Sequence, residues 1–137
     1  MDTRADSKVS AIHLIDDEAD TLTELAISAA DRLPQVSELL LLEIGRAVIH
    51  RRDEIADDVV TMHAMIEFAD GDNGARRSVQ LVYPKDADIS AGRISIMTPV
   101  GAGLIGLRAG QSILWPDRQG HERPLKVEKV IQHPQSA

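Results

Sequence analysis

The chain has 137 residues, no cysteine, three aromatic residues and a formal net charge of −7. This length fits one domain, or one small domain with an appendage, and the lack of cysteine excludes disulfides and thiolate metal sites. No apolar run approaches the roughly 18 residues that span a membrane. The polar start, MDTRADSKVS, has no apolar core of a signal peptide, so we expect a cytoplasmic protein with a disordered tail over residues 1–11.

Acidic residues concentrate in the first half of the chain. Residues 1–58 hold 14 acidic and 6 basic residues, whereas residues 59–137 hold 8 and 9. An acidic front half repels phosphate backbones, and nucleic-acid affinity usually rests on a basic patch. Three aromatic residues also offer few platforms for base stacking. We therefore expect no direct binding to DNA or RNA.

Two helices are expected before the middle of the chain. From Ile15 to Leu33, apolar residues recur at alternating spacings of four and three, which predicts a helix with a coiled-coil seam. Carboxylates at positions 16, 17, 18 and 20 crowd its first turn, where they are solvated and suit the positive end of the helix dipole. Pro34 begins a second helix, expected over residues 35–52.

A connection this short makes the two helices antiparallel. We therefore expect residues 12–54 to form a helical hairpin. Its tip and the flanking acidic residue are Asp31, Arg32, Leu33, Pro34 and Gln35. The second helix is apolar around more than half of its circumference, especially at residues 39–42. One partner helix cannot bury that surface, so we expect leucines on its other flank to pack against the rest of the chain or a second copy.

The period of the apolar residues changes to two from Val59 to Phe68, which predicts a half-buried strand. The turn residues 71–74 lead to a returning strand, and further strands are expected near residues 94–97, 112–115 and 125–131. The predicted fold class is α+β: a helical hairpin followed by a small antiparallel β domain, residues 55–137, with one short helix.

Gly101, Gly103 and Gly106 form a G-x-G-x-x-G pattern directly after the third strand. A dinucleotide site would also need a helix of several turns and a returning strand, and too few residues follow for both. The alternative is that Pro99 begins a short helix and the glycines allow close packing. We prefer this second interpretation and expect no cofactor.

The other candidate sites are weak. Five histidines are scattered without the spacing of metal ligands, so no metal is expected. Asp86 and Asp88 could form a general acid–base pair, but no apolar pocket nearby would shift a pKa. Solvation of an acidic loop, or contact with a partner, remains the alternative for these two residues.

Several strings resemble a known family. D-A-D-I at 86–89, I-S at 94–95, T-P at 98–99 and G-L-I-G at 103–106 resemble the C-terminal domain of the Gre-type transcript cleavage factors. Upstream, L-P at 33–34 and D-V-V-T-M at 58–62 resemble the regulators of nucleoside diphosphate kinase, a short-armed branch of these proteins. The resemblance covers roughly residues 16–132.

The resemblance implies a β domain like FK506-binding protein that docks on RNA polymerase, at the rim of the channel through which nucleotides enter. The docking loop would be Met97, Thr98 and Pro99, protruding and exposed, with Thr98 in place of the family's serine. The acidic loop with Asp86 and Asp88 matches the family as a motif. An effect on nucleoside diphosphate kinase is also implied.

Cleavage factors carry an acidic pair at the tip of a long arm to hold a metal ion. Here Asp31 and Glu38 lie about one turn either side of the tip, Arg32 adds opposing charge, and the arm is short. We therefore expect no enzymatic activity, and competition with cleavage factors. The alternatives are a self-associating hairpin protein without a polymerase role and, least favoured, a peptidyl-prolyl isomerase, whose aromatic cavity this chain cannot build.

Overall fold

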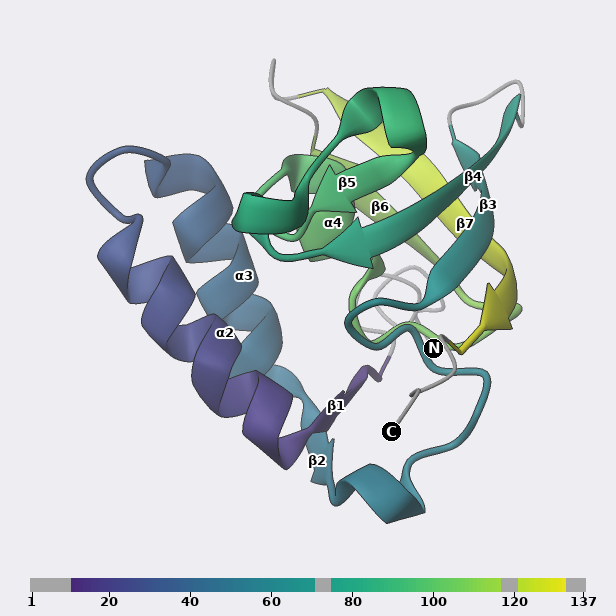
Figure 1. The fold of residues 1–137 in the computed structure, drawn as a ribbon, viewed down its shortest axis with the longest axis horizontal. Helices are drawn as coiled ribbons and strands as arrows, with labels where there is room; N and C mark the ends of the chain where they lie inside the picture. Colours follow the sequence, from purple (N-terminus) through teal and green to yellow (C-terminus); the bar gives the residue numbers. More distant parts are fainter. Residues whose placement is uncertain (1–10, 71–74, 117–120, 133–137) are drawn as a thin grey trace, which may run out of the picture.

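The computed structural model describes residues 11–70, 75–116 and 121–132. A hairpin of α2 (Asp16–Ser28) and α3 (Pro34–Arg46) lies beside a curved five-stranded sheet (Figure 1). Residues 1–10 of the predicted tail and the predicted turn at 71–74 lie outside the described residues. No helix within the described ranges is long and apolar enough to cross a membrane.

The hairpin follows from the predicted seam. Ala19, Leu22 and Ala26 on α2 are all buried, as the alternating spacing requires. Small alanine side chains allow helices to approach closely, and the Ser37 hydroxyl on α3 donates a 2.6 Å hydrogen bond to the Ala26 carbonyl. The predicted antiparallel pair of helices is therefore present.

Both helices end earlier than predicted. α2 ends at Ser28 rather than near residue 33, and α3 ends at Arg46 rather than near residue 52. After α3 the chain forms β2 (Val48–His50), which pairs in parallel with β1 (His13–Ile15). β-Branched residues favour this extended backbone, and the strand pair satisfies backbone groups that a longer helix would have used. The prediction missed this small sheet at the base of the hairpin.

The larger sheet is nearly the predicted one. In spatial order it contains β5 (Arg93–Ser95), β4 (Ala75–Val82), β3 (Met65–Asp70), β7 (Glu122–Ile131) and β6 (Ser112–Pro116). Neighbouring strands are antiparallel except β4 and β5, which are parallel, so the prediction of a wholly antiparallel sheet was wrong at this edge. The connection between them is long enough to carry the chain back before β5 begins, through η2 (Pro84–Asp86) and η3 (Ile89–Ala91).

The strand predicted from Val59 begins only at Met65. The preceding residues pair elsewhere: the Val60 N–H donates to the Leu107 carbonyl at 2.8 Å, and the Gly106 N–H donates to the Val60 carbonyl at 2.9 Å. This segment therefore lies beside the turn after the short helix. A further 3₁₀ turn, η1 (Arg52–Glu54), connects it to β2.

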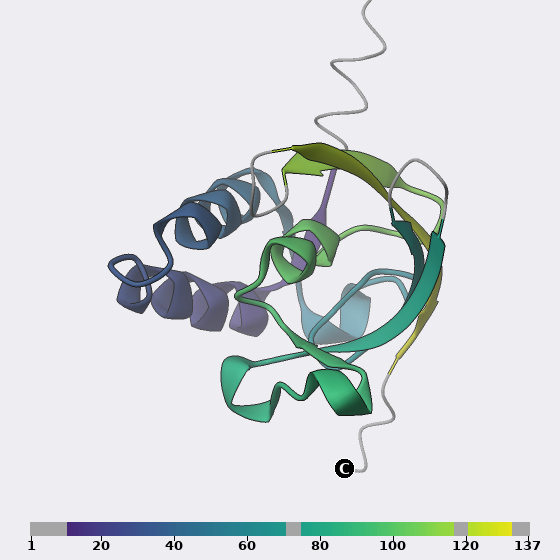
Figure 2. The same ribbon diagram turned by 90° about the horizontal axis from the view of Figure 1, so that it is seen from above.

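The glycine-rich segment forms α4 (Pro99–Leu104), which lies within the curve of the sheet on the side of the hairpin (Figure 2). Pro99 occupies its first turn, as predicted. A Cβ on Gly101 would collide with the Ser95 carbonyl oxygen, so this glycine allows α4 to pack against the end of β5. With only six residues, α4 is too short for a dinucleotide-binding helix.

One hydrophobic core joins the hairpin to the sheet. Leu22 and Leu40 belong to the same buried cluster as Ala102 and Leu104 of α4. Of the leucines at 39–42, Leu40 has 0% exposure and Leu39 is partly buried against this core, whereas Leu42 is 62% exposed, so the predicted packing does not extend to Leu42.

Candidate functional site

The 97–99 segment, between β5 and α4, is shaped by one threonine. The Thr98 hydroxyl donates to the Ser95 carbonyl at 2.8 Å and accepts from the Gly101 N–H at 3.1 Å. Thr98 is therefore the N-cap of α4, a role that serine fills equally well. Thr98 stands where the Gre-type factors have a serine, and this capping role explains why a hydroxyl is present at the position.

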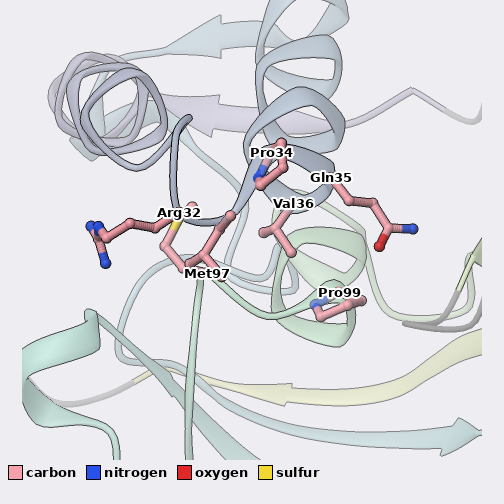
Figure 3. Close-up of a pocket in the computed structure, with 7 residues that line it drawn as sticks. Arg32, Pro34, Gln35, Val36, Met97 and Pro99 are labelled. Atoms are coloured by element: carbon pink, nitrogen blue, oxygen red, sulfur yellow. The ribbon is translucent and has the colours of Figure 1, made fainter.

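The segment does not protrude as predicted. Pro99 is buried and Met97 is only 6% exposed, while Thr98 is half-buried. The reason is that the tip of the hairpin lies over it, with Pro34 and Val36 facing Met97 and Pro99 (Figure 3). Two sets of residues predicted as separate sites, the docking loop and the hairpin tip, are thus brought together.

Between them lies a hollow of about 460 Å³, which we call the tip hollow; its lining residues are Arg32, Leu33, Pro34, Gln35, Val36, Met97 and Pro99. Its lining is mostly apolar, and the side chains of Arg32 and Gln35 extend outward on opposite sides (Figure 3). Leu33, which also lines the hollow, is 36% exposed. An apolar depression flanked by a cation and an amide suits contact with a protein surface.

The acidic loop is separate, because neither Asp86 nor Asp88 lines the tip hollow. Asp88 caps η3, and its Oδ1 accepts from the Ser90 hydroxyl at 2.7 Å and the Ser90 N–H at 3.1 Å. The hydrogen bond from the Ser90 side chain is the main cause that lowers the pKa of Asp88. A lowered pKa keeps this carboxylate ionised, which does not suit a general acid. Asp86 and Asp88 are exposed, and the neighbouring Ile89 is 85% exposed.

The tip does not assemble a metal site. Asp31 and Glu38 are exposed on either side of it. Within the described residues, no three His, Cys, Asp or Glu side chains gather as metal ligands do.

Two polar contacts at the base of the hairpin were missed from the sequence. His13 Nδ1 and His50 Nε2 lie 2.9 Å apart, so one ring donates to the other across β1 and β2. Glu18, expected on the solvated first turn of α2, is buried and accepts from the Met62 N–H at 3.1 Å. No local pattern signals either contact, because the partners are 37 and 44 residues apart in the chain.

Comparison with known proteins identifies the family. The family model described as "Transcription elongation factor, GreA/GreB, C-term" matches residues 55–132, which hold the 97–99 segment, the acidic loop and the whole sheet. The chain belongs to the GreA/GreB family.

Individual relatives are similar in sequence. The regulator of nucleoside diphosphate kinase of Escherichia coli K12 is 36% identical over 102 residues, covering 74% of this chain and 75% of that protein. The transcription elongation factor GreA of Azorhizobium caulinodans is 35% identical over 89 residues, or 62% of this chain and 57% of that protein. These names are those of regulators and elongation factors.

A solved structure shares the whole arrangement. The GreA/GreB elongation factor from Nitrosomonas europaea is 32% identical and superposes with a TM-score of 0.70 over 89% of this chain and 98% of that one. This GreA/GreB-like fold includes both the hairpin and the sheet.

Proposed function

We propose that this GreA/GreB family protein is a non-enzymatic regulator of transcription that binds RNA polymerase and competes with cleavage factors without stimulating RNA cleavage. Family membership supports the link to transcription. The observation that carries the rest is the tip of the hairpin: it lies against the 97–99 segment, and it carries Arg32 rather than a pair of carboxylates.

The hairpin is short. α2 has 13 residues, so at 1.5 Å per residue the arm extends about 20 Å. Its tip residues line the tip hollow together with Met97 and Pro99 of the sheet domain, and the loop between α2 and α3 lies at the left edge of the molecule in Figure 1. A docked protein with this arm occupies the rim of the nucleotide-entry channel while its tip stays near the docking surface.

The chemistry of the tip points the same way. Cleavage requires carboxylates that chelate Mg²⁺ and leave coordination sites open for RNA and water. Asp31 and Glu38 are exposed and flank the turn in the sequence, and the positive charge of Arg32, next to Asp31, opposes the binding of a cation. Occupying the channel without this chemistry makes the protein a competitor of true cleavage factors.

The finer assignments rest on the resemblance. The docking residues are Met97, Thr98 and Pro99 together with the tip that covers them; Asp86 and Asp88 contribute from the separate acidic loop. Likeness of residues 55–137 to FK506-binding protein, with residues 12–54 as the arm, is part of the proposal. Regulation of nucleoside diphosphate kinase, the activity in the name of the Escherichia coli relative, is also part of the proposal.

A pull-down of core RNA polymerase, challenged with a purified cleavage factor, tests the proposal. We expect the protein to be retained and then displaced as the factor is added. Leu33→Asp, which changes a residue that lines the tip hollow, should weaken retention. Ile27→Asp is the matched control, because Ile27 is an exposed apolar residue of α2 that does not line the hollow. Absence of retention, or equal effects of both variants, would reject this docking surface.

Self-association is the second candidate, and the 62% exposure of Leu42 on α3 favours it. Light scattering after gel filtration decides between the two. A stable dimer that Leu42→Asp converts to a monomer would support self-association, whereas a monomeric wild type would exclude it.

A further inference from the structure

Glu18 is the buried carboxylate of the hairpin. It lies on the first turn of α2 and is 7% exposed, whereas its neighbours Asp16 and Asp17 are exposed to solvent. Those two aspartates suffice for the favourable interaction of carboxylates with the helix dipole. The burial of Glu18 therefore needs another explanation.

Its carboxylate contacts two other parts of the chain. Oε1 accepts a 3.1 Å hydrogen bond from the Met62 N–H, in the segment that leads into β3. Oε2 lies 3.7 Å from Nη1 of Arg52 in η1. We call Glu18, Arg52 and Met62 the base latch, because they connect α2, the connecting turn and the sheet domain.

The Met62 N–H needs this carboxylate. Met62 is buried, and a buried backbone N–H without an acceptor is unfavourable. Burial is also the main cause that raises the pKa of Glu18, and the hydrogen bond from Met62 and the charge of Arg52 offset it only in part. The buried Glu18 carboxylate therefore makes a directional hydrogen bond between α2 and the segment before β3, which apolar packing alone does not provide.

Apart from the 2.9 Å backbone hydrogen bond from the His13 N–H to the Gly106 carbonyl, in the strand before α2, the rest of the connection between hairpin and sheet is less directional. Most residues of the connecting stretch 51–57 are exposed. At the far end of the hairpin, the tip meets the 97–99 segment through apolar side chains around a hollow. The base latch therefore adds a side-chain hydrogen bond of defined geometry on α2 itself, at the end of the hairpin opposite to the tip.

We propose that Glu18 is a positioning residue that sets the orientation of the hairpin relative to the sheet domain, and through it the alignment of the tip with the 97–99 segment. A preorganised arm improves affinity for a partner, so we expect an effect on polymerase binding, and this part rests on the proposed function. The effect on the orientation of the hairpin does not depend on the polymerase and can be measured in the free protein.

Two substitutions of similar length separate the hydrogen bond from packing. Glu18→Gln keeps an oxygen that accepts from Met62, whereas Glu18→Met fills the same space without an acceptor. The Arg52 side chain is 55% exposed, so Glu18→Met leaves its charge in contact with solvent rather than buried without a partner. Glu24→Met, at an exposed position of the same helix, is the control.

The chain has no cysteine, so spin labels can be placed at Ser28→Cys on α2 and Ser78→Cys on β4, both exposed. Distances between the labels should be narrowly distributed in the wild type, Glu18→Gln and Glu24→Met. Glu18→Met should broaden the distribution and weaken competition with a cleavage factor about tenfold. Thermal melts confirm that each variant is folded.

A narrow, wild-type distribution in Glu18→Met would overturn the proposal. A broad distance distribution in Glu18→Met with unchanged competition against the cleavage factor would also overturn it, because the orientation of the hairpin would then have no effect on binding. If the wild type does not bind polymerase, the proposed function fails, while the distances still decide the role of Glu18.

Discussion

A Cβ atom placed on Gly106 would lie 2.9 Å from the Cβ of Ile12. Gly106 also has a positive φ of 84°, and its carbonyl accepts a 2.9 Å hydrogen bond from the His13 N–H. The strand before the hairpin thus packs directly on the turn after α4. This contact fixes the start of the hairpin on the sheet domain.

Gly106→Ala should therefore destabilise the protein by about 2–4 kcal/mol, because it combines positive-φ strain with a steric clash. Gly110→Ala is the matched control: Gly110 has a φ of 94°, but a Cβ added to it would meet no atom within 4 Å. Gly110→Ala should therefore destabilise the protein only through backbone strain, by about 1–2 kcal/mol. Denaturant unfolding measures both, and equal losses would contradict the importance of the Ile12 contact.

Leu40→Ala should cost about 2–5 kcal/mol, since Leu40 is fully buried in the core shared by the hairpin and the sheet. Leu42→Ala should change the free energy of unfolding by less than about 0.5 kcal/mol, since Leu42 is 62% exposed. Thermal melts of the two variants test whether α3 faces the sheet domain as described. A large loss from Leu42→Ala alone would mean that α3 is rotated.

Thr98→Ala removes the N-cap of α4 and should destabilise the protein by about 1 kcal/mol, whereas Thr98→Ser should be close to wild type. If Thr98 acts only through this cap, the loss of polymerase binding should follow the loss of stability. A variant that melts normally but no longer binds would instead show that the hydroxyl contacts the polymerase.

Low pH should lower the stability of the protein through His13, at the base of the hairpin. The pKa of His13 is lowered from its ordinary value of 6.5, first by burial and next by the charge of His50 and Arg108, with Asp58 opposing. Because the folded pKa is depressed, this contribution to stability is present above pH 6.5 and is lost as pH falls through the depressed pKa. The melting temperature should fall between about pH 7 and pH 5, and less so in His50→Gln. An unchanged slope in His50→Gln, with exposed His121→Gln as control, would contradict this account.

The parts of the fold that repeat a pattern could be predicted from the sequence. The spacing from Ile15 onward predicts α2, Pro99 predicts the start of α4, and alternation predicts the long strands. The segment 47–49 was misassigned to a helix, because its apolar run fits either structure until β1 pairs with it.

The site was harder to predict. Its residues were found by resemblance, but their burial was not, because it depends on where the hairpin tip lies in space. Glu18 looks like any first-turn carboxylate, and its acceptor role depends on Met62, 44 residues away. Contacts of this kind carry no periodic signal.

The most direct test of the proposed function is transcript cleavage in a stalled RNA polymerase elongation complex. The account predicts no cleavage products with this protein alone, even at high Mg²⁺, and reduced cleavage when a true cleavage factor is also present. Cleavage by the protein alone, abolished by Asp31→Asn, would contradict it.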